Sequence, residues 1–143
     1  MVYEVLKVKL FLGGKVMRGV HKFYKCSHCG NLAALIEDKG VPLVCCGEKM
    51  PELIPNTVDA STEKHVPAAT VSGERLEVQV GSVPHPMTEE HHITYVYVGS
   101  ENGGQRKGLK PGMEPKLSFS FVDDKPLTAY AYCNLHGLWK AEI

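Results

Sequence analysis

The sequence has no long apolar run and no excess of charge of either sign. None of its apolar stretches reaches the roughly 18 residues that a membrane-spanning helix needs, and the first twelve residues are interrupted by Glu4, Lys7 and Lys9. Sixteen basic and sixteen acidic side chains give a formal net charge of zero. A neutral chain has no global field that attracts nucleic acid or an anionic membrane. We therefore expect neither nucleic-acid nor membrane binding, no cleaved leader and a cytoplasmic location.

Helical periodicity, internal repeats and low-complexity tracts are also missing. The 143 residues and 43% hydrophobic content suffice for one ordinary domain or two small ones. Short alternating segments recur in the second half, separated by turn-forming clusters at 101–104 and 122–126. The expected strands are Arg75–Val80, His92–Val98, Lys116–Val122 and Leu127–Cys133. This pattern is typical of an antiparallel β-sandwich.

Cysteines are few and odd in number, which argues against a disulfide framework. Four of the five form a Cys-x-x-Cys pair, Cys26 and Cys29, followed after fifteen residues by the adjacent pair Cys45 and Cys46. Four thiolates bind zinc or iron, and both metals accept tetrahedral sulfur coordination. Taken alone, this segment favours a structural zinc ribbon, although an adjacent cysteine pair should distort the tetrahedron. The short stretch 21–51 buries little core, so a metal would supply stability.

The fifth cysteine begins a second motif, in which Cys133 and His136 lie three residues apart. Upstream, His65, His85 and the pair His91-His92 offer further imidazoles. Imidazole nitrogens and a thiolate suit iron. Two adjacent histidines on a strand point to opposite faces, so only one of the pair faces such a site. His21 and His28 match no motif of this kind, and we interpret them as exposed or hydrogen-bonded side chains.

Together the two motif sets resemble desulfoferrodoxin, the two-iron form of superoxide reductase. The resemblance runs from about Lys22 to Ile143. It implies a mainly β fold, in which a small desulforedoxin-like domain with a rubredoxin-like knuckle (21–51) precedes a linker (52–64) and an immunoglobulin-like antiparallel β-sandwich (65–143). Residues 1–20 form an N-terminal extension to which we assign no function, and for which we expect a strand and a turn.

The resemblance also implies the ligands of two non-haem irons. The first iron would be bound by Cys26, Cys29, Cys45 and Cys46. The second, catalytic iron would be bound by His65, His85, His91, His136 and Cys133, with the thiolate in an axial position and one coordination site open. The family often has an aromatic residue after the third histidine, so the resemblance favours His91 over His92 as the ligand.

Glu63 and Lys64 immediately precede His65. A fixed ammonium group attracts an anion such as superoxide and stabilises a bound peroxide. In the resembling family, Glu63 would coordinate the ferric iron after peroxide has left. An anonymous Glu-Lys pair is usually an ordinary surface feature, but adjacency to His65 favours the functional interpretation.

The resemblance implies a superoxide reductase that acts in oxidative-stress defence. It would reduce superoxide to hydrogen peroxide, receive electrons from a rubredoxin-like donor and form a homodimer. One alternative is an electron-transfer iron protein without catalytic turnover. Another, suggested only by the first four cysteines, is a zinc-stabilised binding module.

Overall fold

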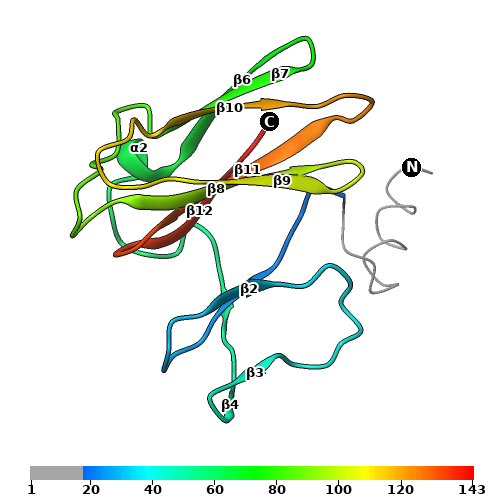
Figure 1. Cartoon of the computed structure of the whole chain (residues 1–143), viewed down its shortest axis with the longest axis vertical. Helices are drawn as coiled ribbons and strands as arrows, with labels where there is room; N and C mark the ends of the chain where they lie inside the picture. Colours follow the sequence, from blue (N-terminus) through cyan, green and yellow to red (C-terminus); the bar gives the residue numbers. More distant parts are fainter. Residues whose placement is uncertain (1–17) are drawn as a thin grey trace.

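The structure is a computed structural model that describes residues 18–143, so most of the predicted extension 1–20 lies outside the described residues. The larger part of the chain forms two antiparallel sheets (Figure 1). One has the strand order β10-β7-β6 and the other β12-β11-β8-β9. The strands are β6 (Pro67–Ser72), β7 (Arg75–Val80), β8 (Ile93–Ser100), β9 (Gly104–Gly108), β10 (Lys116–Ser120), β11 (Pro126–Cys133) and β12 (Gly137–Glu142). The mainly β fold and the antiparallel sandwich are confirmed.

The four strands expected from alternation are all present, and Arg75–Val80 has the expected bounds. The sequence analysis did not find β6, β9 and β12. Each of these lies at the edge of its sheet. Edge strands pack on only one neighbour and need less apolar sequence, so β9, with its polar Gly-Gln-Arg-Lys-Gly sequence, gives no signal of alternation.

The sandwich core follows the two-residue period of its strands. Leu76, Val78 and Val80 of β7 are fully buried, while the intervening Glu77 and Gln79 lie closer to solvent. Facing them, the second sheet contributes inward side chains that include Ala129, Ala131 and Cys133. The alternation therefore places Cys133 inside the sandwich, at the end of β11.

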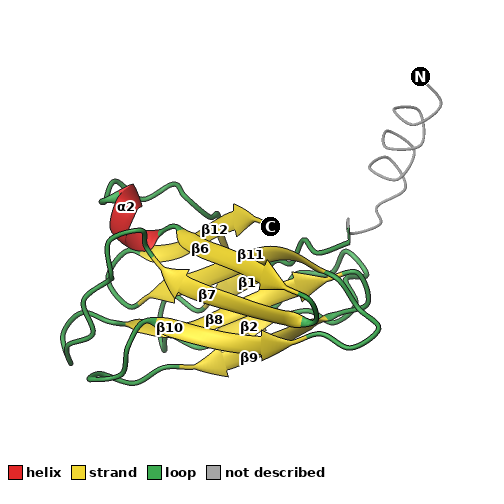
Figure 2. Ribbon diagram, turned by 90° about the horizontal axis from the view of Figure 1, so that it is seen from above, coloured by secondary structure: helices red, strands yellow, loops and turns green. Residues whose placement is uncertain are grey.

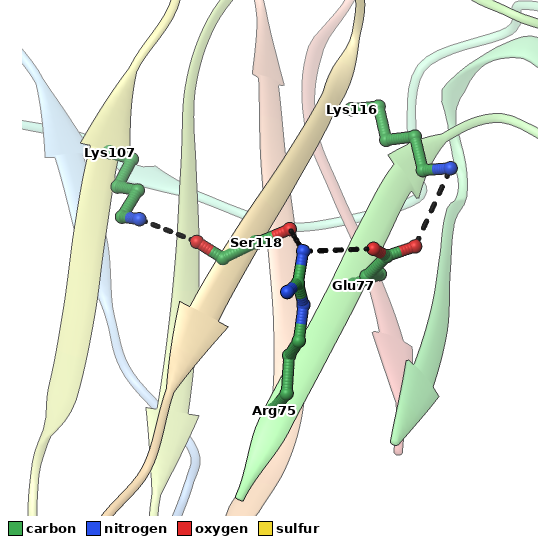
Figure 3. Close-up of polar contacts among 5 residues, drawn as sticks. All are labelled: Arg75, Glu77, Lys107, Lys116 and Ser118. Carbon is green, nitrogen blue, oxygen red and sulfur yellow. Dashed lines mark hydrogen bonds and ion pairs between the residues drawn. The ribbon is translucent and has the colours of Figure 1, made fainter. Parts of the chain in front are cut away.

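Polar side chains connect the two sheets where β9 and β10 meet at their edges (Figure 3). Lys107 of β9 donates to the carbonyl oxygen of Ser118 in β10, and Gln105 Nε2 donates to the Ser120 carbonyl at 2.7 Å. Arg75 lies 3.2 Å from Ser118 Oγ and 3.4 Å from Glu77. An exposed ion pair such as Arg75–Glu77 contributes about 0.2–1 kcal/mol. The bonds of Lys107 and Gln105 occupy carbonyl groups on the open edge of β10.

A smaller N-terminal unit precedes the sandwich and lies below it in Figure 1. It contains a three-stranded sheet, β2-β1-β5, formed by β1 (Phe23–Lys25), β2 (Leu32–Ala34) and β5 (Glu52–Leu53), and a hairpin of β3 (Val44–Cys45) and β4 (Glu48–Lys49). The Phe23 ring packs on Tyr97 and Tyr130 at centroid distances of 5.4 and 5.2 Å. The unit thus rests on the outer face of the four-stranded sheet.

The stretch 52–64 contains both regular structure and connecting chain. It begins with β5, which pairs with β1, and its end overlaps α2 (Thr62–His65). Between them, Asn56 binds β12: its Nδ2 donates to the Lys140 carbonyl at 3.2 Å, and its Oδ1 accepts the Lys140 N–H at 2.9 Å. The connection is therefore fastened to the sandwich. Among the described residues, no helix has the length and apolar character to cross a membrane.

Candidate metal centres

The four cysteines of the N-terminal unit come together at one point. Cys26 follows β1, and its carbonyl accepts the Gly30 N–H at 3.1 Å, which closes the turn that carries Cys29. Cys45 ends β3, and Cys46 with Gly47 forms a two-residue hairpin turn with φ of 51° and 77°. This left-handed turn explains how adjacent cysteines can serve one centre, because Cys45 lies on the strand and Cys46 on the turn.

The sulfur spacings suit a tetrahedral metal ion. All four sulfurs lie within 4.8 Å of one another. Cys29 Sγ is 3.6 Å from Cys45 Sγ, which is 4.0 Å from Cys46 Sγ. Four sulfurs bonded to one ion at about 2.3 Å lie about 3.8 Å apart. The residues present therefore fit a four-thiolate metal centre.

The thiols differ in how readily they ionise without a cation. Backbone N–H groups of Cys29 and His28 lower the pKa of Cys26 to about 6. By contrast, the thiols of Cys29 and Cys26 raise the pKa of Cys46 to about 12. One thiolate is thus stabilised by the backbone, whereas the full set needs a positive ion to be deprotonated together.

The second group consists of His65, His91, Cys133 and His136. The helix α2, whose last residue is His65, lies at one end of the sandwich (Figures 1 and 2). His65 closes α2, and its Nδ1 donates to the Ser61 carbonyl at 2.6 Å. His85 Nδ1 donates to the Pro86 carbonyl at 2.6 Å. A carbonyl oxygen only accepts, so each Nδ1 carries the hydrogen and each neutral ring presents a bare Nε2.

These two bare nitrogens face each other at 3.1 Å. Burial lowers the pKa of His65, and it lowers that of His85 to about 4, so both rings are neutral near pH 7. Two lone pairs at this distance repel each other unless a cation lies between them. Two nitrogens bound at right angles to one ion, with bonds of about 2.1 Å, lie about 3.0 Å apart. The pair therefore fits two ligands of a single metal ion.

The remaining residues of the group complete this arrangement. His136 Nδ1 lies 3.1 Å from His65 Nε2 and 3.9 Å from Cys133 Sγ. The His91 ring is 4.6 Å from that of His85 and 4.9 Å from that of His136. His91 Nε2 is buried and has no hydrogen-bond partner among the described residues, as expected of a nitrogen kept for a metal. Four imidazoles and one thiolate thus converge.

His91, and not His92, belongs to this group. The expectation that the pair lies on a strand is wrong, because β8 begins only at Ile93. A turn directs His91 instead: its N–H donates to Thr88 Oγ1 at 3.1 Å, and its carbonyl accepts the Thr88 N–H at 2.9 Å. The choice between the two histidines therefore follows from this turn and not from strand alternation.

Cys133 is the buried sulfur of the group. Burial raises the pKa of its thiol, while backbone N–H groups of His136 and Leu135 act in the opposite direction. A buried thiol of this kind becomes a thiolate when a cation binds it. The five side chains thus offer donor atoms that suit one transition-metal ion.

Glu63 and Lys64 lie on α2 with their side chains exposed. The main chain beneath them is fixed, because the Glu63 carbonyl accepts the Val83 N–H at 3.0 Å. Gly81 lies against this segment with φ of 83°, and a Cβ there would be 2.6 Å from the Lys64 carbonyl oxygen. Only glycine fits this close approach. The two charged side chains are thus exposed on a backbone that is held in place.

Several neighbours of the second group were not found from the sequence as site residues. Asn134 lies between two of its members, and the Trp139 ring stacks on His65 at 4.9 Å.

Two further histidines lie outside both groups. His28 is an exposed partner of Glu48 at 3.0 Å, and His21 packs against Tyr97 at a centroid distance of 4.8 Å. Neither His21 nor His28 belongs to a metal-binding group among the described residues.

Comparison with known proteins gives consistent matches over both parts of the chain. The family model described as desulfoferrodoxin matches residues 57–142, and the one described as desulfoferrodoxin, N-terminal domain, matches residues 19–53. A desulfoferrodoxin homolog of Archaeoglobus fulgidus is 43% identical over 125 residues, covering 87% of this chain and 99% of the relative. The desulfoferrodoxin of Nitratidesulfovibrio vulgaris is 43% identical over 126 residues, covering 88% and 99%.

A solved structure extends the similarity to three dimensions. The crystal structure of the superoxide reductase from Treponema pallidum superposes with a TM-score of 0.72 at 36% sequence identity. The superposition covers 85% of this chain and 98% of that one. Both the N-terminal unit and the sandwich therefore have counterparts in known proteins.

The buried histidines predict how the metal-free protein responds to acid. The pKa of His85 is about 4 in the folded chain and near 6.5 in an unfolded one. Between these values the unfolded state binds more protons, so the free energy of unfolding should fall as the pH falls from about 6.5 to about 4. Urea unfolding of the metal-free protein across this range measures the slope.

The matched variants are His85→Gln and His28→Gln, the second replacing an exposed histidine outside the group. We expect His85→Gln to flatten the slope and His28→Gln to leave it unchanged. An equal slope in His85→Gln and the unaltered protein would contradict a neutral, buried His85.

Proposed function

The chain belongs to the desulfoferrodoxin family, and from this premise we propose that it is a superoxide reductase. The reaction consumes one superoxide, one electron and two protons and yields one hydrogen peroxide. This proposal rests on the observation that four imidazoles and the Cys133 thiol come close together, and that the Nε2 atoms of His65 and His85 carry no hydrogen. Five protein ligands leave a coordination position for a small anion, which is a feature of catalytic centres and not of closed structural ones.

Two irons serve the reaction in this proposal. The first would be held by Cys26, Cys29, Cys45 and Cys46, and the second by His65, His91, His136 and Cys133 together with His85, whose Nε2 lies 3.1 Å from that of His65. When bound at the second site, ferrous iron supplies the electron and the open position for superoxide. The imidazoles bind as neutral donors, and the thiolate adds a strong donor that favours transfer of the electron outward.

Lys64 and Glu63 act on the substrate side in this proposal. The Lys64 ammonium attracts superoxide and, through water, helps to deliver protons to the product. The Glu63 carboxylate would be the protein group that occupies the open position once peroxide has left. Support comes from the exposed side chains of both residues, directly before the ligand His65 on α2.

A rubredoxin-like protein is the proposed electron donor. Its access to the first centre is supported by the exposure of Cys29 and Cys46 and by a hollow of about 480 Å³ beside Cys26 and Cys29. Thiolate ligands persist in a reducing compartment, so we place the reaction in the cytoplasm. Reduced rubredoxin should bleach the oxidised first centre in a stopped-flow experiment, and an unchanged spectrum would contradict this donor.

We further propose that two copies of the chain form a homodimer. The N-terminal unit exposes several large apolar side chains: Leu32, Ile36, Val41 and Val44. A unit this small gains stability when such surface is buried against a partner. Light scattering behind a sizing column should give twice the chain mass, and a monomer at micromolar concentration would contradict the proposal.

The steering role of Lys64 gives the most direct test of the catalytic assignment. Lys64→Ala should slow the second-order reaction of the reduced protein with superoxide by about tenfold at low salt, within the range of electrostatic steering. The rate should also lose most of its dependence on ionic strength. Pulse radiolysis over a series of salt concentrations measures both quantities.

The matched control is Lys125→Ala, which removes an exposed charge next to the opposite end of β11 from Cys133. Both variants should retain two irons and the iron spectra of the unaltered protein. Equal rates for Lys64→Ala and Lys125→Ala at low salt would exclude the steering role, and zinc at both sites would contradict the function itself.

A further inference from the structure

We propose that Asn134 is a positioning residue for His91, joining the turn that carries Cys133 and His136 to the segment that carries His91. This inference rests on the proposed function, because it concerns the second metal site. Asn134 bonds to the residues on both sides of His91. Its Oδ1 accepts the His92 N–H at 2.9 Å, and its Nδ2 donates to the Glu90 carbonyl at 3.0 Å.

The position of Asn134 in the sheet explains why a side chain performs this task. β8 and β11 pair antiparallel, with Cys133 opposite Ile93 and an irregularity between Tyr132 and Cys133. One step further, the Asn134 N–H still donates to the His92 carbonyl at 3.1 Å. In a regular ladder the Asn134 carbonyl would accept the His92 N–H in return. Here Oδ1 of its side chain accepts that N–H instead.

Because the side-chain oxygen replaces the Asn134 carbonyl as the acceptor, the main chain is free to turn toward the metal group. Because the Asn134 carbonyl is not held in the ladder, residues 134–137 can form the turn that brings His136 Nδ1 to 3.9 Å from Cys133 Sγ. The indole N–H of Trp139 fixes the far side of the same turn by donating to the His136 carbonyl at 3.0 Å. β11 ends at Cys133, yet Asn134 keeps the register of this chain with the segment that carries His91.

His91 depends on this contact more than the other histidines depend on theirs. His65 and His85 each have a ring Nδ1 bonded to a carbonyl at 2.6 Å. For His91, the described contacts are main-chain bonds to Thr88, and its ring Nε2 is buried without a partner. Its placement therefore rests on the backbone, which Thr88 and Asn134 hold from its two sides. Partners that orient metal ligands typically contribute 10–100-fold to metal affinity.

The chemistry requires an amide at this position. The oxygen must accept an N–H and the nitrogen must donate to a carbonyl, and only Asn offers both at this length. Asn134→Asp keeps the acceptor but loses the donor and places a negative charge against the Glu90 carbonyl. Asn134→Ala removes both bonds. The two variants therefore separate the half of the contact at His92 from the half at Glu90.

The test uses the full-length protein loaded with iron at both sites, which gives an internal reference. A ferrous chelator is titrated against each variant, and the metal remaining at each site is followed by its own absorption. We expect Asn134→Ala to weaken iron binding at the second site by about tenfold or more. The iron affinity of Asn134→Asp should lie between those of Asn134→Ala and the unaltered protein. The first site should be unchanged in both.

The matched control is Asn102→Ala, because Asn102 Nδ2 also bridges two loops by donating to the Asp123 carbonyl at 3.4 Å. It should not change iron affinity at either site. The oxidised second centre should also shift its thiolate-to-iron absorption in Asn134→Ala and not in Asn102→Ala. A merely structural effect would lower the unfolding midpoint and leave that absorption where it is.

A double-mutant cycle with His91→Ala completes the test. If Asn134 acts through His91, adding Asn134→Ala to His91→Ala should cost little further affinity. Additive losses, or unchanged affinity in Asn134→Ala alone, would overturn the inference while the second site still binds iron. Failure of the unaltered protein to bind iron at that site would instead overturn the proposed function.

Discussion

The second centre depends on two buried imidazole nitrogens that are held so close together that their lone pairs repel each other. His65 and His85 present bare nitrogens to each other at 3.1 Å because two carbonyl groups hold the hydrogens on the far sides of the rings. Burial disfavours relief by protonation. A metal ion is thus the species that satisfies these nitrogens.

One strand and two side chains place the other members of the second group. β11 fixes Cys133 by alternation, and the hydrogen bonds of Asn134 and Trp139 then fix His136 and His91 around it. The N-terminal unit packs on the opposite face of the same sheet through Phe23. Phe23 and Cys133 therefore lie on opposite faces of the four-stranded sheet. The second site is built by the sandwich, while the first site leaves Cys29 and Cys46 exposed.

Much of this could be predicted from the sequence, the central strands from alternation and the two ligand sets from the resemblance to desulfoferrodoxin. The cysteine spacing alone favoured a structural zinc ribbon, and the edge strands β6, β9 and β12 were not predicted. The local turn that selects His91 was not predicted, and neither was the role of Asn134, which follows from the register of β8 with β11. Register depends on contacts between residues about forty positions apart.

The most direct test of the central claim is a stoichiometric titration of the fully reduced two-iron protein with superoxide. Hydrogen peroxide, dissolved oxygen and the spectrum of the second centre would be followed together. The account predicts one peroxide for each superoxide consumed, one iron oxidised in the protein for each peroxide, and no oxygen released by the reaction. Oxygen produced alongside peroxide, or a second centre that superoxide does not oxidise, would contradict it.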